Sequence, residues 1–197
     1  APPTRKVNLI IDIQARLKAG KGAGYERWAK VYNLKQMAAA LQYLQENGLL
    51  SYEELEARAA TASEKFHTLS GQMQQLETDM QTNAALKGAI VEYAKARPVF
   101  EQYKASKYSR KFLAEHEGEI ALYRAATAQF DALLGGAKLP KMDRLKAEWQ
   151  ELSAKKKAAY KEYRAARSTM QEVLTVKANI DALLGAPKQE KSKEQER

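Results

Sequence analysis

The sequence contains no cysteine, little glycine and little proline, and each shortage limits the possible folds. Without cysteine the chain forms no disulfide, no thiolate metal site and no cysteine nucleophile. Only 10 glycines and 5 prolines interrupt 197 residues, so turns must be few. β-Branched residues are scarce outside Val7 to Ile13, whereas Ala, Glu, Lys, Gln, Leu and Arg dominate and favour helix. We therefore predict an all-α protein.

Long apolar runs are also missing. No stretch reaches the roughly 20 apolar residues of a membrane-spanning helix, and the start Ala1-Pro2-Pro3 lacks the apolar core of a signal peptide. We therefore expect no membrane insertion and a cytoplasmic location, which the absence of cysteine also fits.

Histidine is too scarce for an evident metal or acid–base site. Neither His67 nor His116 has other ligand-type residues at metal-binding spacing. His116 falls on an apolar helix face, so we interpret it as a packing residue, and His67 as a surface residue. Ten tyrosines offer possible nucleophiles, but activation needs an adjacent base or metal, and most of them lie at core spacing. We predict no catalytic residue, metal or cofactor in this chain.

Two stretches before residue 51 predict a short helical hairpin. Apolar residues recur at helical spacing from Asn8 to Lys18 and again from Tyr25 to Asn47, with Gly48 at the position of a C-terminal cap. The glycine-rich segment from Gly20 to Gly24 connects them. We assign residues 1–50 to this hairpin domain.

A long helix is predicted over residues 51–106. Ser51 and Glu54 form a capping-box pattern at its start. Beyond residue 80 the heptad register would place Asn83 and Lys87 inside, so we expect a phase slip and a local distortion there. Pro98 should kink or restart the helix, because its ring clashes with the carbonyl four residues back. The heptad seam runs through Leu55, Ala59, Ala62, Phe66, Leu69, Met73, Leu76 and Met80.

Two further helices are predicted over residues 109–135 and 141–185. Ser109 can cap the first, and Gly135-Gly136 stops it. The second keeps a four-three alternation of seam residues at Leu145, Trp149, Leu152, Lys156, Ala159, Tyr163, Ala166, Met170, Val173, Lys177, Ile180 and Leu184.

The lengths of these helices predict an elongated molecule. At about 1.5 Å rise per residue, the helices over 51–106 and 141–185 would each reach on the order of 60–80 Å. Short connections favour antiparallel neighbours, so residues 51–185 should form an antiparallel helical bundle or coiled coil, arranged as a three-stranded rod. The polar tail over 186–197 is expected to lack a fixed structure.

Positive charge is the feature that helix packing leaves unexplained. The chain has 33 Lys and Arg against 24 Asp and Glu, a net charge of +9, which makes a polyanion a reasonable partner. The first 30 residues hold seven cations and two acids. The candidate nucleic-acid-binding residues chosen from this end are Arg5, Lys6, Lys21, Arg27 and Lys30.

The glycines around Lys21 raise a second possibility at the same end. Glycines let backbone N–H groups approach a phosphate ahead of a helix. However, no strand precedes this loop and no Ser or Thr follows Lys21, so it lacks the pattern of a nucleotide-binding loop. A flexible turn is the alternative interpretation.

A second group of candidates lies in the last helix at Lys155, Lys157, Lys161 and Arg164. The last three recur at i, i+4 and i+7 and share one helix face, which could follow a phosphate backbone. Solvated helices also carry charge runs without any ligand, and Glu162 lies within the group. Both readings remain open at this level.

Four extended stretches carry a family resemblance. They are residues 5–38 (RKVNLIIDIQARLKAGKGAGYERWAKVYNLKQMA), 108–117 (YSRKFLAEHE), 155–164 (KKKAAYKEYR) and 176–185 (VKANIDALLG). Together they resemble the C-terminal region of relaxases, the mobilisation nucleases of conjugative elements from Gram-positive bacteria. The resemblance covers nearly the whole chain but includes no catalytic signature.

This resemblance implies a function for the parent protein. Relaxases of this family nick one strand at a transfer origin with a nucleophile, usually tyrosine, and a histidine-bound divalent metal, both in the N-terminal nuclease domain. This chain has no histidine cluster, so none of those residues carries over and we expect no nicking activity. We expect a non-catalytic domain that binds DNA at the transfer origin or the transferred strand. The alternative is an interaction rod that docks the relaxase to a coupling protein or accessory relaxosome proteins, or forms a homodimer.

Overall fold

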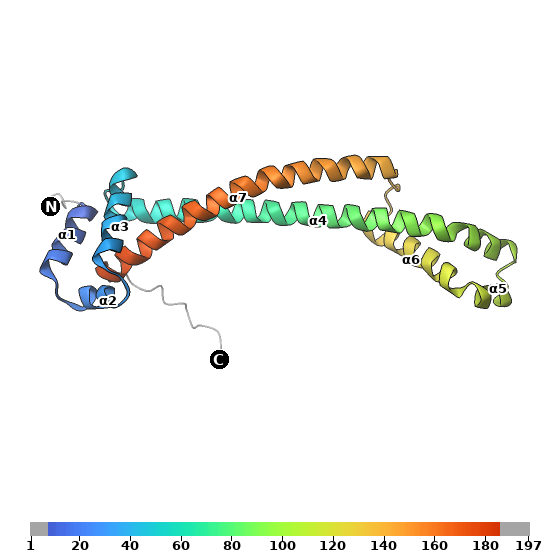
Figure 1. Ribbon diagram of the computed structural model, residues 1–197, viewed down its shortest axis with the longest axis horizontal. Coiled ribbons are helices and arrows are strands. Elements are labelled where there is room, and N and C mark those ends of the chain that lie inside the picture. Colours follow the sequence, from blue (N-terminus) through green and yellow to red (C-terminus); the bar gives the residue numbers. More distant parts are fainter. Residues whose placement is uncertain (1–7, 186–197) are drawn as a thin grey trace, which may run out of the picture. The chain divides into compact units, whose positions relative to one another are not determined.

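The computed structural model describes residues 8–185, and over that range its regular elements are all α-helices (Figure 1). The all-α prediction is thus confirmed. Arg5, Lys6 and the tail 186–197 lie outside the described residues. Among the helices described, none combines the length and apolar character needed to cross a membrane. The helices are α1 (Leu9–Ala19), α2 (Ala23–Val31), α3 (Leu34–Glu46), α4 (Tyr52–Ala105), α5 (Arg110–Glu115), α6 (Glu117–Leu134) and α7 (Met142–Leu184).

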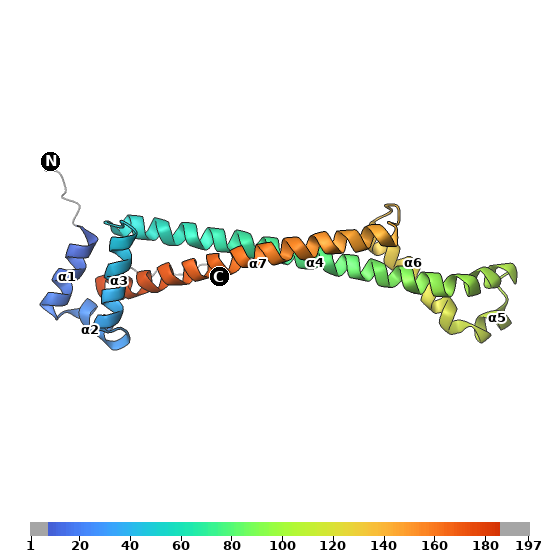
Figure 2. The ribbon, with the colours of Figure 1, turned by 45° about the horizontal axis from the view of Figure 1, so that its top comes forward.

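Contacts divide the chain into two compact units that share the two long helices. The first unit contains the described part of residues 1–69 and 163–197, and the second contains residues 70–162. Figures 1 and 2 show α1, α2 and α3 beside the start of α4 and the end of α7 within the first unit. In the second unit, α6 runs back along α4. Residue 50 is therefore not the boundary between the units, because the N-terminal helices share a core with both long helices.

The core of the first unit draws on all of its helices. Apolar residues at helical spacing on α1, α2 and α3 meet the seam faces of α4 and α7. Burying one such side chain contributes about 1.5–3 kcal/mol, so this shared core is the main stabilising feature of the unit. Its largest fully buried side chains are Ile13, Trp28, Met37, Leu44, Leu55, Val173, Ile180 and Leu183.

The helix predicted over residues 25–47 is two helices in the structure. The first helix ends at Val31, and Asn33 caps the second: its Oδ1 accepts from the backbone N–H of Gln36, and Gln36 Oε1 accepts from the Asn33 N–H, both at 2.9 Å. This reciprocal capping box satisfies N–H groups that lack intrahelical partners. The expected hairpin is therefore a three-helix arrangement, because a local polar cap outweighs continuous helical propensity.

The predicted seams of the long helices are confirmed by burial. All eight seam positions from Leu55 to Met80 are buried or half-buried, and so are all twelve from Leu145 to Leu184. The predicted capping box at the start of α4 is also present. Glu54 N–H donates to Ser51 Oγ at 3.2 Å, and Ser51 N–H donates to Glu54 Oε2 at 3.1 Å.

In the second unit α4 changes its partner near residue 87. Asn83 is buried and donates to the Leu145 carbonyl at 2.9 Å, and Lys87 lies 4.3 Å from the Trp149 ring centroid, so both face α7. The next apolar stripe faces α6, where Phe100 stacks on Tyr123 with ring centroids 3.8 Å apart. The expected distortion at Asn83 is therefore wrong: α4 continues, and the slip in its pattern marks a change of partner. Along α4, contacts to α7 at Asn83 and Lys87 therefore give way to contacts to α6 at Phe100.

An expected restart at Pro98 is absent, and a break at His116 lies within a helix predicted to be continuous. α4 continues through Pro98, so the helix does not restart there. Proline leaves the Ala94 carbonyl without its usual donor, and both residues are exposed, so water can satisfy that carbonyl. The helix predicted over 109–135 breaks at His116, whose ring packs 4.3 Å from that of Phe112.

Candidate nucleic-acid interface

The basic group on α7 divides according to helix geometry. Lys157 and Lys161 are exposed, and at about 100° per residue they lie roughly 40° apart on the side opposite the seam. Lys155 is also exposed but lies about 160° around the helix from Lys157. Arg164 is exposed and belongs to the first unit. Within the second unit, the structure therefore brings Lys157 and Lys161 together and places Lys155 elsewhere.

Lys146 is a member of this face that the sequence pattern alone did not single out. It is exposed and precedes Lys157 by 11 residues, about three helical turns, so the two differ by only about 20° around α7. An 11-residue spacing would have revealed it. We call Lys146, Lys157 and Lys161 the α7 cation face.

The charges of the α7 cation face are not neutralised locally. Among the described residues, none of its three lysines has an ion pair within 4.0 Å. Lys156 provides the contrast, because it is half-buried in the seam and its Nζ lies 3.3 Å from Glu77 Oε1. Exposed unpaired cations on one face can contact an anionic surface without first breaking an internal ion pair.

The N-terminal candidates do not form one surface of equivalent cations. Lys21 and Lys30 are exposed on the α1–α2 loop and on α2. Arg27 is exposed too, but its guanidinium lies beside Gly185, where a Cβ would come within 2.6 Å of Nη2. Gly185 directly follows α7, and a cation is favourable at the carbonyl end of a helix. Arg27 therefore has a structural role in addition to its exposure.

The glycine-rich loop is explained by close packing. A Cβ on Gly24 would collide with the carbonyl oxygen of Leu183, because the first turn of α2 lies against the last turn of α7. The positive end of one helix dipole thus meets the negative end of another. Gly20 and Gly22 have φ values of 60° and 100°, which favour glycine. The structure supports the turn interpretation of this loop, because α7 covers the start of α2.

The tyrosines with altered acidity are shifted away from the ionised form. Burial raises the pKa of Tyr43, and the nearby Glu172 carboxylate raises it further. Burial also raises the pKa of Tyr52 and of Tyr123, with added contributions from hydrogen bonds to Asp181 and to Tyr93. A raised pKa keeps a phenol protonated, whereas a tyrosine nucleophile needs its proton removed.

Histidine and carboxylate positions do not form a metal-binding group within residues 8–185. His67 is exposed, and His116 is half-buried against Phe112. These positions agree with the surface and packing roles that the sequence indicated.

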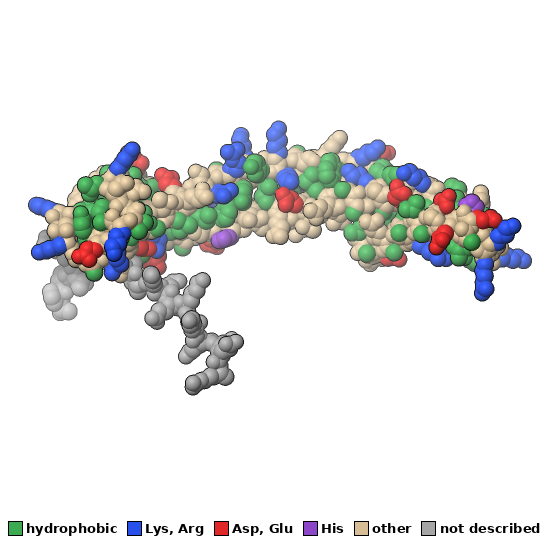
Figure 3. Space-filling view, turned by 60° about the horizontal axis from the view of Figure 1, so that its bottom comes forward, with side chains coloured by type: hydrophobic (Ala, Val, Ile, Leu, Met, Phe, Trp, Pro, Cys, Tyr) green, Lys and Arg blue, Asp and Glu red, His purple; other side chains and the backbone are tan. Residues whose placement is uncertain are grey.

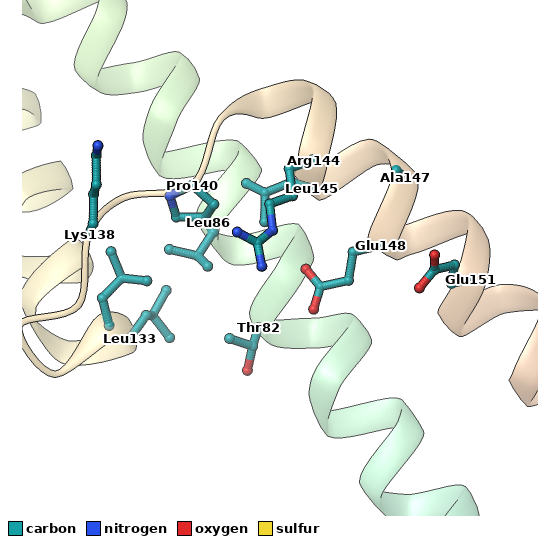
Figure 4. Close-up of a pocket in the computed structure, with 11 residues that line it drawn as sticks. Thr82, Leu86, Leu133, Lys138, Pro140, Arg144, Leu145, Ala147, Glu148 and Glu151 are labelled. Atoms are coloured by element: carbon teal, nitrogen blue, oxygen red, sulfur yellow. The ribbon is translucent and has the colours of Figure 1, made fainter.

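A hollow of about 680 Å³ lies in the second unit where the α6–α7 connection meets α4 (Figure 4). Figure 4 shows the Arg144 guanidinium and the Glu148 carboxylate turned toward each other. Glu148 Oε2 also accepts a 3.0 Å hydrogen bond from Asn83 Nδ2. Lys138 and Glu151 add a second charge of each sign to the lining. Because opposite charges alternate here, the hollow presents no surface of one sign to a ligand.

A narrower groove of about 300 Å³ lies between α3 and α7 in the first unit. Its lining includes Tyr32, Ala40, Tyr43 and Val176, with Glu172 as its acidic member. At the nearby α2–α3 junction, Leu34 is 68% exposed. This region is a second candidate binding surface, which is apolar where the α7 cation face is charged.

Comparison of the chain with protein-family models, with curated proteins and with solved structures gives no match.

Proposed function

We propose that this chain is a DNA-binding helical domain that acts beside the nuclease domain of a conjugative relaxase. The observation that carries the proposal is the α7 cation face, whose exposed lysines lack ion pairs within the described residues. The net charge of +9 supports a polyanionic partner. The extended resemblance to relaxase C-terminal regions supports the transfer origin or the transferred strand as the place of binding.

The geometry favours contacts to the DNA backbone. Lys157 and Lys161 are about 6 Å apart along the helix axis, and Lys146 lies about 16 Å farther back. Lysines that reach phosphates hold a protein on DNA and release counterions, but they do not read base sequence. We therefore expect binding that depends strongly on salt and weakly on sequence.

Fluorescence anisotropy with duplex DNA of origin and of random sequence, over a salt series, tests this proposal. Lys157→Glu and Lys161→Glu should each weaken binding to both duplexes and reduce the slope of log K against log salt by about 1. Lys155→Glu is the matched control, because it makes the same charge change on another side of α7 and should have a smaller effect. No binding at low salt, or equal losses in all three variants, would overturn the proposal.

A protein-docking function is the second candidate, and it rests on exposed apolar residues in the first unit. Val31 and Leu34 are 70% and 68% exposed at the α2–α3 junction, near the α3–α7 groove. Under this alternative, the domain joins a relaxase to a coupling protein, to accessory relaxosome proteins or to a second copy. Light scattering, combined with pull-down against these purified proteins, separates it from DNA binding. Loss of capture in Val31→Ser/Leu34→Ser with unchanged DNA affinity would favour docking.

A further inference from the structure

The turn that ends α4 has an unusual backbone. Lys107 and Tyr108 have φ values of 58° and 59°, in the left-handed region that glycine usually occupies. Lys107 N–H donates to the Lys104 carbonyl at 2.9 Å, and Tyr108 N–H donates to the Tyr103 carbonyl at 3.1 Å. These are the two hydrogen bonds of a Schellman motif. The motif normally places glycine where this chain has Lys107.

The other helices with left-handed C-terminal turns do use glycine. α1, α3, α6 and α7 are each followed by a glycine with positive φ, namely Gly20, Gly48, Gly135 and Gly185. Strained backbone at non-glycine residues is concentrated at functional sites. The side chains of Lys107 and Tyr108 are therefore the features to explain, since glycine would satisfy the turn with less strain.

The turn is held rigidly by short-range hydrogen bonds. Ser106 Oγ donates to the Tyr103 carbonyl at 2.6 Å and accepts from the Ser109 N–H at 3.2 Å. Ser109 Oγ then accepts from the Phe112 N–H at 3.4 Å and caps α5. The side chains presented at this turn thus have a defined direction.

Positive charge is concentrated around the same turn. Residues 104–111 contain four cations and no acid. Lys104 and Lys111 lie 3.8 and 4.0 Å from Glu101 and Glu115, so both pairs are long. Within the described chain, Lys107 and Arg110 have no ion pair within 4.0 Å and are exposed. Figure 3 shows Lys and Arg side chains projecting from the α5 end of the unit.

Tyr108 adds an exposed aromatic ring to the same turn as these cations. The residue is 58% exposed, and its ring makes an edge-to-face contact with Tyr103 at 5.2 Å between centroids. Tyr103 is only 5% exposed and packs beside Phe100 and Phe112. The buried Tyr103 ring thus supports the exposed Tyr108 ring.

We propose that the Lys107–Arg110 turn binds single-stranded nucleic acid, with a base stacked on Tyr108 and the adjoining phosphates held by Lys107 and Arg110. An aromatic ring flanked by cations is the arrangement that binds unpaired strands with little sequence preference. Duplex DNA hides its base faces, so it would contact only the cations. The Schellman motif accounts for the contact between Tyr108 and Tyr103. It does not account for the positive φ values at non-glycine residues or for the unpaired cations.

This site lies on different residues from the α7 cation face, and it extends the proposed DNA function to unpaired strands. Separate variants test the two proposals, so either can be contradicted without the other. Variants of the turn should change single-strand binding, whereas Lys157→Glu and Lys161→Glu should change duplex binding. Loss of one effect leaves the other proposal standing.

Fluorescence anisotropy with a labelled oligothymidylate and a duplex of equal length tests the turn in the full chain. Tyr108→Ala should weaken single-strand binding roughly tenfold or more and leave duplex affinity nearly unchanged. Tyr108→Phe is the matched control, because it keeps the ring and should retain single-strand affinity. Single-strand affinity of Tyr108→Ala within twofold of the wild type, with unchanged circular dichroism, would overturn the proposal.

Lys107→Gly separates a binding role from a structural one. Glycine relieves the strain at positive φ, so the thermal unfolding midpoint should rise. Single-strand affinity should nevertheless fall several-fold, because a phosphate contact is lost. A variant that is more stable and binds as well as the wild type would overturn the role of Lys107 and, with it, the proposed site.

Discussion

Trp28 Nε1 donates a 2.7 Å hydrogen bond to Asn179 Oδ1 in the core of the first unit. The two residues are 151 positions apart and are 2% and 3% exposed. A buried amide oxygen and a buried indole N–H satisfy each other, so α2 is held against α7 in one orientation. Because the last turn of α7 also covers Gly24, this pair positions the N-terminal helices in the unit.

Breaking this pair should destabilise the protein. Trp28→Phe leaves Asn179 Oδ1 buried without its donor and should lower the free energy of unfolding by about 1–3 kcal/mol, plus a cavity cost. In the double variant Trp28→Phe/Asn179→Leu, the loss should be smaller than the sum of the two single losses, since no buried polar atom remains unpaired. Urea unfolding measures all four proteins. Strictly additive losses would contradict the coupling.

Gly24 should be far less tolerant of substitution than a solvent-facing glycine. Gly24→Ala places a methyl group against the Leu183 carbonyl and should destabilise the protein by about 1–3 kcal/mol despite its better helix propensity. Gly71→Ala is the matched control, because Gly71 lies in α4 with no atom within 4 Å of an added Cβ. That variant should gain about 1 kcal/mol. Thermal and urea unfolding measure both variants. If both substitutions change the free energy of unfolding in the same direction, the close approach of Gly24 to the Leu183 carbonyl is contradicted.

Substitutions at Asn83 should show that this position of the α4–α7 seam accepts an apolar side chain but not a charged one. Its Nδ2 donates to the Leu145 carbonyl and to Glu148, while its buried Oδ1 has no protein partner. Asn83→Asp replaces the donor by a carboxylate facing two oxygens and should cost about 3 kcal/mol or more at neutral pH. Asn83→Leu removes the unpaired oxygen and should raise the free energy of unfolding by about 1 kcal/mol. Urea unfolding measures both variants. Equal free energies of unfolding for Asn83→Asp and Asn83→Leu would contradict this account.

Stability should fall as the pH rises above about 10. Tyr52 Oη donates to Asp181 at 2.6 Å, and Lys177 Nζ lies 2.8 Å from the same carboxylate. Burial and this hydrogen bond raise the pKa of Tyr52 above 10.0, and the hydrogen bond to Asp181 raises the pKa of Lys177 above 10.5. The folded state therefore keeps protons that the unfolded chain releases. The stabilisation is complete below the unfolded pKa values and is lost as pH rises through the folded ones.

Urea unfolding from neutral pH to about pH 11 measures this loss. Tyr52→Phe should reduce the decline in the free energy of unfolding, because one of the shifted groups is removed. Tyr160→Phe is the control, since it removes the same hydroxyl from a tyrosine that is 51% exposed. A decline of equal slope in the wild type and in Tyr52→Phe would contradict the role of the Tyr52–Asp181 bond.

Local sequence features predicted many of the helix ends. The Ser51–Glu54 capping box, the Ser109 cap and the stops at Gly20 and Gly135 each depend on residues a few positions apart, and each is present. The Asn33–Gln36 capping box obeys the same rule but lay within a continuous apolar pattern. The prediction therefore extended the helix through a break that the cap requires.

The candidate interface could be predicted only in part. Helical spacing found Lys157 and Lys161, and an 11-residue spacing would have added Lys146. Arg27 could not be assigned in advance, because its position beside Gly185 depends on a segment far along the chain. The left-handed backbone at Lys107 and Tyr108 could not be predicted, since φ values are not visible in residue types.

The sequence by itself determined an all-helical chain, its main seams and several of its caps, because these follow from propensity, periodicity and hydrogen bonds between near neighbours. The tertiary structure decided where α4 exchanges α7 for α6, why Gly24 must be glycine and which cations remain unpaired. Those features depend on residues brought together from distant positions, such as Trp28 with Asn179. Their energies come from burial and close contact, which no local pattern contains.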